Sequence, residues 1–388
     1  MAKRSVVQAN VAGKRVLVRV DFNVPLDGDR IADDTRIRAA LPTIQLLRQR
    51  AARVVLMSHL GRPKGVPDPA LSLTPVAERL GELLGAPVTT TGPDVEAAVA
   101  NLRDGDVLLL ENLRFNTGEE TNDPAFADSL ARLGDLYVDD AFGAAHRAHA
   151  SIVGVAERLP SFAGLLLLRE TETLGRLLER PARPFVAILG GAKVSDKLGV
   201  VRRLLDRVDR LLIGGGMANT FLLAEGFEIG RSLAEAERMD DAKAMLEHSR
   251  SRGVEIVLPE DVVVAPAIAA EWGAAVAAGE VSPDQSIFDI GPRTVERFGE
   301  SIADAGTIFW NGPMGVFERP PFASGTLGIA QAVAMSGAFT VVGGGDSVAA
   351  VEQSGMAEAI DHISTGGGAS LELLEGRALP GLAVLPDA

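Results

Sequence analysis

The chain has 388 residues, of which 47% are hydrophobic and 23% are charged, and it contains no cysteine. This length exceeds what a single hydrophobic core sustains, so two domains of roughly 150 to 200 residues are expected. The lack of cysteine excludes disulfides and thiolate chemistry and suits the reducing cytoplasm. A formal net charge of −14 argues against nucleic acid and acidic membranes as partners, and an anionic ligand would need a local cluster of positive groups.

Short apolar runs alternate with amphipathic stretches along the chain, which is typical of a parallel α/β architecture. No apolar run is long enough to span a membrane. Helices are predicted over 33–50, opened by Asp33 and Asp34, and over 74–84, with Thr74 as N-cap, Pro75 at the first helical position and Gly85 as the stop. Strands are predicted near 14–20, 53–58, 106–110, 136–139, 185–189, 209–213, 254–258, 306–310 and 338–342.

The stretch 165–179 (LLLLRETETLGRLLE) has a helical pattern and is followed by Pro181 and Pro184. We interpret it as a helix that connects two doubly wound, Rossmann-like domains, each built on a parallel sheet. One continuous sheet is the alternative, but nine or more strands and a break flanked by prolines favour two domains. In such open sheets, ligands bind beyond the carboxyl ends of the strands, so the residues that follow each strand are informative.

Every predicted strand of the first half is followed by basic residues. The segments are RVDFNVP (19–25), SHLGRP (58–63), ENLRF (111–115) and DDAFGAAHRAH (139–149). A single arginine is more often a solvated surface charge, but four strand ends in succession favour a site for a small, multiply anionic ligand. His146 and His149 could bind a metal, although ordinary hydrogen bonding is favoured without a third ligand. The candidate binding residues are Asp21, Asn23, Arg36, His59, Arg62, Arg114 and Arg147.

Strands of the second half end in glycines instead. The loops are GGAK (190–193), GGGMA (214–218), NGPMGVFE (311–318) and GGGDS (343–347), and STGGGAS (364–370) precedes a further helical pattern. None is a Walker A loop or a dinucleotide fingerprint. Glycines also serve at turns and helix caps. Their repetition at strand ends nevertheless favours a nucleotide site, because they let backbone N–H groups approach phosphate. Asp346 could hold Mg²⁺ there.

Two of the six lysines, Lys193 and Lys197, lie in the first glycine loop and its continuation, whereas the other 32 basic residues are arginines. If the chain is helical from Val194 onward, these two lysines share one helix face. A compact ammonium group can follow a moving phosphate better than a fixed guanidinium fork. A solvated helix terminus is the simpler interpretation of the same pair.

Ten segments of the chain occur in the order typical of one enzyme family. They are RVDFNVP, SHLGRP, LLENLRF, DAFGAAHRAHAS, GGAKVSDK, IGGGMANTF, FDIGP, WNGPMGVFE, GGGDS and STGGGASLELLEG. Over nearly its whole length the sequence therefore closely resembles phosphoglycerate kinase. One departure is Ser347, where the family usually has threonine, and the hydroxyl group is retained.

This resemblance implies a hinge-bending bilobal kinase. It implies a 3-phosphoglycerate-binding domain over 1–168 and 377–388, a connector over 169–184 and a nucleotide-binding domain over 185–376. The seven candidates of the first half would bind 3-phosphoglycerate. Glu318 would approach the ribose and Asp346 the metal. The implied nucleotide-binding residues are Gly190, Gly191, Ala192, Lys193, Lys197, Gly214, Asn311, Glu318, Gly344, Gly345, Asp346 and Ser347.

The implied reaction is a reversible, Mg²⁺-dependent phosphoryl transfer between ATP and the carboxylate of 3-phosphoglycerate, by a cytoplasmic monomer. No general base is expected, because a carboxylate with a pKa around 4 is already ionised. The residues expected to act on the transferring group are Arg36, Lys193, Lys197, Gly367 and Gly368. Two alternatives are an NAD-dependent dehydrogenase, which would need the missing fingerprint, and a non-catalytic phosphate-binding module, which would not need the second, glycine-lined half.

Overall fold

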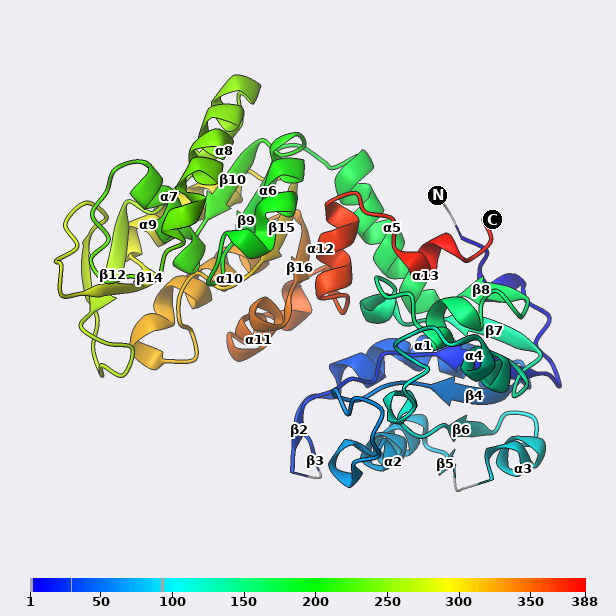
Figure 1. Ribbon diagram of the computed structural model, residues 1–388. Helices are drawn as coiled ribbons and strands as arrows, with labels where there is room; N and C mark the ends of the chain where they lie inside the picture. The colour runs from blue at the N-terminus through cyan, green and yellow to red at the C-terminus, as the bar shows by residue number, and fades with distance from the viewer. Residues whose placement is uncertain (1–2, 29, 92–93) are drawn as a thin grey trace. The chain divides into compact units, whose positions relative to one another are not determined.

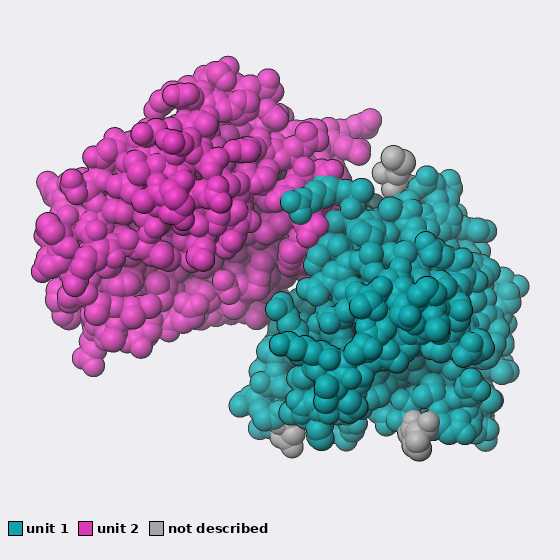
Figure 2. All heavy atoms as spheres, viewed as in Figure 1, with its two compact units in different colours: residues 1–172, 377–388 teal, residues 173–376 magenta. Residues whose placement is uncertain are grey.

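The structure is a computed structural model that describes residues 3–28, 30–91 and 94–388. The chain divides into two compact units, which Figure 2 distinguishes by colour. Unit 1 comprises Met1–Glu172 and Arg377–Ala388, and unit 2 comprises Thr173–Gly376. The first two residues of the predicted first domain lie outside the described residues. Among the helices that the structure describes, none combines the length and the apolar character needed to cross a bilayer.

Unit 1 is built on a six-stranded sheet in the order β5-β6-β4-β1-β7-β8, and every neighbouring pair is parallel. A short antiparallel hairpin, β2–β3, follows β1. The strands are β1 (Arg15–Arg19), β2 (Leu26–Asp27), β3 (Arg30–Ile31), β4 (Arg53–Met57), β5 (Val88–Thr90), β6 (Val107–Leu109), β7 (Leu136–Asp139) and β8 (Ser161–Ala163). The α-helices are α1 (Thr35–Gln49), α2 (Thr74–Leu84), α3 (Val95–Ala100), α4 (Pro124–Ala131) and α13 (Pro380–Ala383).

Unit 2 repeats this plan with a parallel sheet in the order β11-β10-β9-β15-β16-β17. It adds a three-stranded antiparallel sheet in the order β13-β12-β14. The strands are β9 (Phe185–Leu189), β10 (Arg210–Ile213), β11 (Glu255–Val257), β12 (Asp261–Ala265), β13 (Ala274–Ala277), β14 (Ser286–Ile290), β15 (Thr307–Asn311), β16 (Phe339–Gly343) and β17 (His362–Ser364). The helices are α6 (Leu198–Leu205), α7 (Gly215–Ala224), α8 (Met239–Arg252), α9 (Pro292–Ala303), α10 (Ser324–Met335), α11 (Gly345–Gln353) and α12 (Gly368–Leu374).

The predicted α/β class is confirmed, and so are all nine predicted strands, each within one residue at either end. The predicted connecting helix is α5 (Leu165–Glu179). Gly85 ends α2 in the left-handed conformation, as predicted. The prediction of Thr74 as N-cap is wrong, because Leu73 holds that position. The helix start is fixed from outside by Glu111, whose carboxylate accepts hydrogen bonds from the Leu73 N–H and the Ser72 hydroxyl.

The two cores lie between sheet and helices. In unit 1, Val16 and Val18 of β1 and Val54 and Leu56 of β4 pack with Ile44 of α1. In unit 2 the corresponding cluster joins side chains of β9 and β15 to helices α9, α10 and α11. The central strands are buried on both faces, as is usual in parallel sheets, so polar residues gather in the loops at the strand ends.

The last residues of the chain pack within unit 1. Lys3 Nζ donates to Asp387 Oδ1 (2.8 Å), so the two ends of the described chain lie side by side near β8 (Figure 1). The Gly381 N–H of α13 donates to the Ala145 carbonyl (2.8 Å). This contact joins α13 to the loop that follows β7, which carries the predicted site residue Arg147.

The beginning of α5 is held by a fully buried carboxyl group. Asp140 Oδ1 accepts hydrogen bonds from the N–H groups of Leu166 (2.8 Å) and Leu167 (3.3 Å), and Thr43 Oγ1 accepts one from the Leu165 N–H (2.9 Å). These bonds satisfy donors that the helix itself leaves without partners. Burial nevertheless raises the pKa of Asp140 to about 7, although the hydrogen bonds oppose that shift.

We therefore predict that Asp140→Asn weakens the pH dependence of stability. The pKa is raised in the folded state from an ordinary value of 3.8 to about 7. Asp140 thus contributes stability that is present below pH 4 and lost as the pH rises through 7. Asparagine keeps the accepting oxygen but cannot ionise. Urea unfolding at pH 5 and pH 8 should show a stability loss that is smaller in the variant by about 2 kcal/mol. Equal losses in both proteins would contradict this assignment.

Candidate active site

The four basic loops of unit 1 follow strands that are neighbours in the sheet. Strands β6, β4, β1 and β7 are its four central strands and are all parallel, so their carboxyl ends meet at one edge. The loops that follow them are 110–116, 58–63, 20–25 and 140–149. The order of these strands could not be read from the sequence. It brings together candidate residues that are separated by up to 126 positions.

Asp21 and Arg36 form an ion pair at this edge. Arg36 Nη1 lies 2.7 Å from Asp21 Oδ2, and about a third of the Arg36 side chain remains exposed. Arg36 is in the first turn of α1, so the pair fixes that turn next to the end of β1. Asn23 Oδ1 accepts a hydrogen bond from the Gly61 N–H (2.9 Å) and thereby ties this loop to the one that carries the exposed Arg62.

His59 is buried among positive charges. Burial lowers its pKa well below the usual value, and the charges of Arg19, Arg114 and Arg147 lower it further. The Nδ1 atom of His59 lies 3.1 Å from Arg19 Nη2, and Arg19 is fully buried. The histidine is therefore neutral at physiological pH, and the positive charge of this site comes from arginines.

Arg114 is buried, and two of its side-chain nitrogens find no hydrogen-bond partner among the described residues. Its Nη1 donates to the Gly61 carbonyl (2.6 Å). Its Nε is 3.2 Å from Glu120 Oε1 without forming a hydrogen bond, and its Nη2 finds no hydrogen-bond partner among the described residues. Burial lowers the pKa of Arg114, but a guanidinium stays charged at neutral pH. Leaving such donors unpaired is costly, so the site is suited to an anion that accepts from them.

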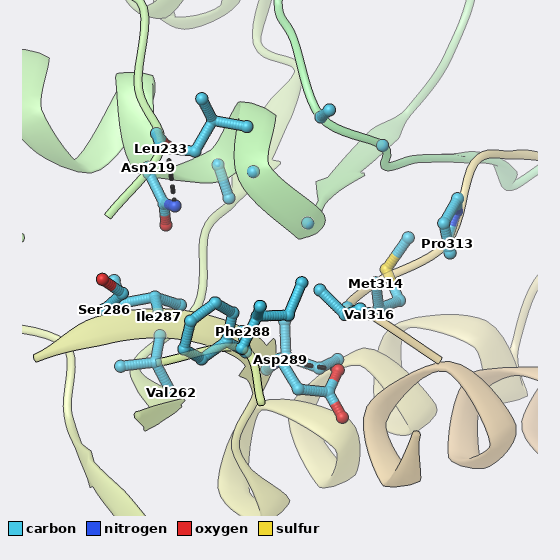
Figure 3. A pocket seen from close by; sticks show the side chains of 18 of the residues that line it. Asn219, Leu233, Val262, Ser286, Ile287, Phe288, Asp289, Pro313, Met314 and Val316 are labelled. Atoms are coloured by element: carbon cyan, nitrogen blue, oxygen red, sulfur yellow. Dashed lines mark hydrogen bonds between the residues drawn. The ribbon is translucent and has the colours of Figure 1, made fainter. Parts of the chain in front are cut away.

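The glycine loops of unit 2 also follow neighbouring strands, because β10, β9, β15 and β16 are adjacent in the sheet. Beside them is a cavity of about 720 Å³. Its lining includes Gly191, Ala192 and Gly215 of the glycine loops and the carboxylate residues Glu318 and Asp346. Figure 3 shows its apolar part, in which residues of β14 face residues near α7 and the loop after β15. The apolar residues labelled there are Leu233, Val262, Ile287, Phe288, Pro313, Met314 and Val316.

Some of these glycines are required by loop packing. A Cβ atom on Gly190 would lie 2.1 Å from the Pro313 carbonyl oxygen, and one on Gly215 would lie 2.7 Å from the Gly191 nitrogen. Three loops therefore interlock with no room for side chains. Gly345 differs, since a Cβ there would meet no atom within 4 Å. The open space at the start of α11 is compatible with a ligand that approaches the backbone.

Lys197 joins two of the loops from inside. Its Nζ donates to the carbonyls of Gly190 and Asn311, both at 2.8 Å, and the side chain is buried. Burial lowers the pKa of Lys197 to about 8, and the charges of Asp346 and Asp196 oppose that shift. Two backbone carbonyls carry no full negative charge, so the buried ammonium can still be neutralised by a phosphate group.

Lys193 and Lys197 do not share a helix face, because the α-helix does not begin at Val194. A 3₁₀ turn spans Ser195–Lys197 and the α-helix begins only at Leu198, so the exposed Lys193 precedes both. The cause is Glu235, whose carboxylate accepts hydrogen bonds from the Ser195 N–H (2.8 Å) and the Ser195 hydroxyl (2.5 Å). Sequence reasoning missed Glu235, because no local pattern relates it to a loop 40 residues away.

Two of the predicted nucleotide-binding residues use their polar side-chain atoms for hydrogen bonds within the loops. Asn311 is buried, and its Nδ2 donates to the Gly343 carbonyl (2.8 Å). Ser347 is fully buried, and its hydroxyl accepts a hydrogen bond from the Gly312 N–H. Both residues therefore brace the loops after β15 and β16. Sequence reasoning also missed the buried Asp289, which lines the cavity and whose pKa burial raises to about 7.

The remaining predicted residues lie at helix starts. Gly344 precedes α11, whose first turn carries the exposed Asp346, and Gly367 and Gly368 begin α12. Within residues 3–28, 30–91 and 94–388, no three histidine, aspartate or glutamate side chains gather to form a metal site. A metal at Asp346 would therefore need oxygens from a ligand, which is how Mg²⁺ is usually held beside phosphate.

Fold and sites together define a two-unit α/β kinase, with a basic site in one unit and a glycine-lined cavity in the other. Residues 6–377 match the family model described as phosphoglycerate kinase. The chain is 57% identical to the phosphoglycerate kinase of Roseiflexus sp. (strain RS-1), with both chains fully covered. It is 59% identical to that of Rubrobacter xylanophilus, covering 100% of this chain and 99% of the relative.

Solved structures agree with the sequence relatives. The structure of phosphoglycerate kinase from Coxiella burnetii is similar with a TM-score of 0.88 at 43% identity, and 98% of each chain is covered. The enzyme from Pyrococcus horikoshii OT3 gives a TM-score of 0.84 at 36% identity, again with 98% of each chain covered. The chain belongs to the phosphoglycerate kinase family. It is therefore a phosphotransferase of a glycolytic family whose substrates are ATP and 3-phosphoglycerate.

We predict that ADP binding takes up a proton at Lys197. At pH 8.5 much of the buried ammonium is deprotonated, and an adjacent phosphate raises the pKa of Lys197 because it favours the charged form. Calorimetric titration in two buffers of different ionisation enthalpy should show this uptake in the wild type. Lys197→Met should abolish it, whereas Lys193→Met, which removes an exposed ammonium, should keep it. Unchanged uptake in Lys197→Met would refute the assignment.

Proposed function

We propose that this chain catalyses the reversible, Mg²⁺-dependent transfer of a phosphoryl group between ATP and the carboxylate of 3-phosphoglycerate, giving ADP and 1,3-bisphosphoglycerate. The observation that carries the proposal is a pair of chemically different anion sites in one family member. Unit 1 offers buried guanidinium donors that find no hydrogen-bond partner among the described residues, and unit 2 offers a glycine-lined cavity with a buried lysine. Membership of the family sets aside the dehydrogenase and the simple binding module.

The acceptor substrate is assigned to the basic edge of unit 1. Its phosphate and carboxylate groups require several cations, and Arg36, Arg62, Arg114 and Arg147 supply them in bidentate form. Neutral His59, together with Asp21 and Asn23, is suited to the hydroxyl and the remaining oxygens. The unpaired donors of Arg114 give this assignment its strongest support, because binding an anion there removes an existing cost.

The nucleotide is assigned to the cavity of unit 2. Its apolar wall suits a base, and exposed Glu318 suits ribose hydroxyl groups. The phosphates are assigned to Gly190, Gly191, Ala192, Lys193, Lys197 and Gly214, and to the start of α11 at Gly344, Gly345 and Asp346. Asn311 and Ser347 act by holding these loops in place.

Asp346 is assigned as the protein ligand of Mg²⁺. Its carboxylate is exposed in the first turn of α11 and lines the nucleotide cavity. A hard cation takes one or two carboxylates and completes its shell with phosphate oxygens and water. When bound, the metal neutralises part of the phosphate charge, and the lysines and backbone donors of unit 2 bind the rest.

The chemistry needs charge and position more than proton transfer. The attacking carboxylate is already ionised, and phosphoryl transfer places negative charge on three equatorial oxygens. We assign their stabilisation to Arg36, Lys193 and Lys197 and to the backbone N–H groups at Gly367 and Gly368. Such preorganised donors often supply the largest part of a rate enhancement.

An acyl phosphate product must be shielded from water while nucleotide enters and leaves. We propose that residues 1–168 with 377–388 act as the acceptor half, that 185–376 act as the nucleotide half, and that bending in 169–184 and near Ser364 and Thr365 unites the two ligands. The glycolytic family supports a cytoplasmic location. We propose a monomer, because all the groups assigned to the two substrates come from this one chain.

The reaction is tested directly by a coupled assay. Purified protein should form 1,3-bisphosphoglycerate from 3-phosphoglycerate only when ATP and Mg²⁺ are both present, and chelation with EDTA should abolish the product. Separate calorimetric titrations with Mg-ADP and with 3-phosphoglycerate should each show one site. Binding of only one of these ligands, with no turnover, would return the chain to the class of simple binding modules.

Arg36→Ala should lower kcat far more than nucleotide affinity. Loss of one donor to the transferring group costs about 10²- to 10³-fold in kcat, while the dissociation constant of Mg-ADP should change less than twofold because Arg36 lies in unit 1. Arg38→Ala is the matched control, since Arg38 lies on the same helix and pairs with Asp34 on the surface. Parallel losses of kcat and ADP affinity in Arg36→Ala would remove this residue from the transferring site.

A further inference from the structure

Arg19 is the last residue of β1 and is fully buried, yet none of the assigned ligand contacts involves it. Its guanidinium bonds in three directions. Nε donates to Ser151 Oγ (2.8 Å), Nη1 donates to the Val20 carbonyl, and Nη2 lies 3.1 Å from His59 Nδ1. A buried arginine has few ways to change these partners without leaving donors unpaired.

The contact with His59 determines where the imidazole carries its proton. A guanidinium group has five N–H donors and no acceptor, so the ring nitrogen that faces it must offer a lone pair. His59 Nδ1 is therefore unprotonated, and in the neutral ring the proton is on Nε2. A protonated Nδ1 would set one N–H against another, which breaks the bond and leaves two buried donors without partners.

The Nε end of the guanidinium is held by a hydrogen-bond network whose donors and acceptors can be arranged in only one way. The Ser151 hydroxyl donates to Glu119 Oε1 (2.6 Å), so its lone pair accepts from Arg19 Nε. The Ser151 N–H also donates to Glu119 Oε2 (3.0 Å), and Glu119 is fully buried. Because a carboxylate only accepts and a guanidinium group only donates, the hydrogen bonds must run from Arg19 to Ser151 and from Ser151 to Glu119.

Ser151 is held in place by an uncommon backbone turn. Residues Ala150–Gly154 form a single π-helical turn, and the hydroxyl of Tyr137 donates to the Ser151 carbonyl (2.8 Å). Such turns occur often at functional sites, where they re-aim a side chain. This turn directs the serine toward Arg19 at the end of β1, which is the strand that precedes the Asp21 and Asn23 loop.

The charged and titratable groups around His59 favour its neutral form. Arg19, Arg114, Arg147 and His149 all disfavour a second positive charge on the ring. The nearest carboxylate, Asp21, has its Oδ1 4.0 Å from His59 Nδ1, beyond hydrogen-bond distance, and its Oδ2 is engaged by Arg36. Among the described residues, no carboxylate thus lies within hydrogen-bond distance of Nδ1, where it would favour a proton on that nitrogen.

We propose that Arg19 is a positioning residue that holds His59 as the neutral Nε2–H tautomer, so that the ring presents one fixed hydrogen-bond donor to an oxygen of bound 3-phosphoglycerate. The inference rests on the proposed function for the role of that donor. The tautomer itself depends only on contacts within unit 1. Sequence reasoning treated Arg19 only as the first letter of RVDFNVP, because nothing local shows which arginines are buried.

The direct test is nitrogen-15 NMR of histidine-labelled protein without ligand. The chain has five histidines, and the His59 signals are assigned by their loss in His59→Gln. The wild type should show the Nε2–H tautomer with no titration between pH 5.5 and 8. An Nδ1–H tautomer, or a ring that titrates near 6.5, would overturn the proposal without any variant of Arg19.

Arg19→Met removes the donors and keeps much of the side-chain volume. His59 should then exchange between tautomers, and its pKa should rise, although burial and the charges of Arg114 and Arg147 still hold it below the ordinary value. The KM for 3-phosphoglycerate should rise about 3- to 10-fold at pH 8, the value of one neutral hydrogen bond. The ratio of variant to wild-type KM should fall as the pH is lowered through the pKa of the freed ring, because a charged ring donates from both nitrogens. The KM for ATP should not change.

The double variant Arg19→Met/Glu119→Gln guards against misfolding, because it removes both charges from the buried network and leaves neither uncompensated. It should show the same freed histidine. A folded variant in which the His59 tautomer is unchanged would overturn the proposal. The function is judged separately: if His59→Gln leaves 3-phosphoglycerate binding intact while the wild-type tautomer is as stated, the assigned acceptor site fails and the positioning of His59 stands.

Discussion

Parallel pairing of neighbouring strands is the constraint on which both sites depend. In unit 1 the pairs β6–β4, β4–β1 and β1–β7 place four carboxyl ends at one edge, and in unit 2 the pairs β10–β9, β9–β15 and β15–β16 do the same. Since the strands themselves are almost entirely apolar, the polar chemistry of each unit is confined to the loops that follow them. The same scaffold thus carries arginines in one unit and glycines in the other.

A protein with a net charge of −14 must bury cations to hold anions, and the two units do so differently. Unit 1 balances the fully buried Arg19 through Ser151 against the fully buried carboxylate of Glu119. Unit 2 gives the Lys197 ammonium hydrogen bonds to two backbone carbonyls, with the charges of Asp346 and Asp196 acting on it without a hydrogen bond. A buried carboxylate in the hydrogen-bonded network keeps the first cation in place when the site is empty, whereas the second depends more on its ligand.

The sequence could predict what is local. Strands β9 and β15 are continuous apolar runs, so the fold class follows from the sequence. The loops after these strands can be identified in the sequence, which locates candidate site residues at the strand ends. Strands β5, β8 and β17 read VTT, SFA and HIS and lack the apolar run that marks the equally short β6 (VLL). The antiparallel sheet was missed because β13 reads as alanine and valine without clear alternation. Distant partners such as Glu235 for Ser195, and Glu119 for Ser151, depend on tertiary packing that periodicity does not record.

The basic residues at the two sites also differ in how their charge depends on pH. Arginines stay charged across the physiological pH range, and a neutral histidine among them contributes a hydrogen bond of fixed direction but no charge. The basic site of unit 1 thus keeps a constant positive charge. Lys197, with a pKa lowered to about 8, is a cation whose charge varies under mildly alkaline conditions. Because a phosphate would restore that charge, the charge of the proposed nucleotide site depends on its ligand, whereas the charge of the basic site in unit 1 does not.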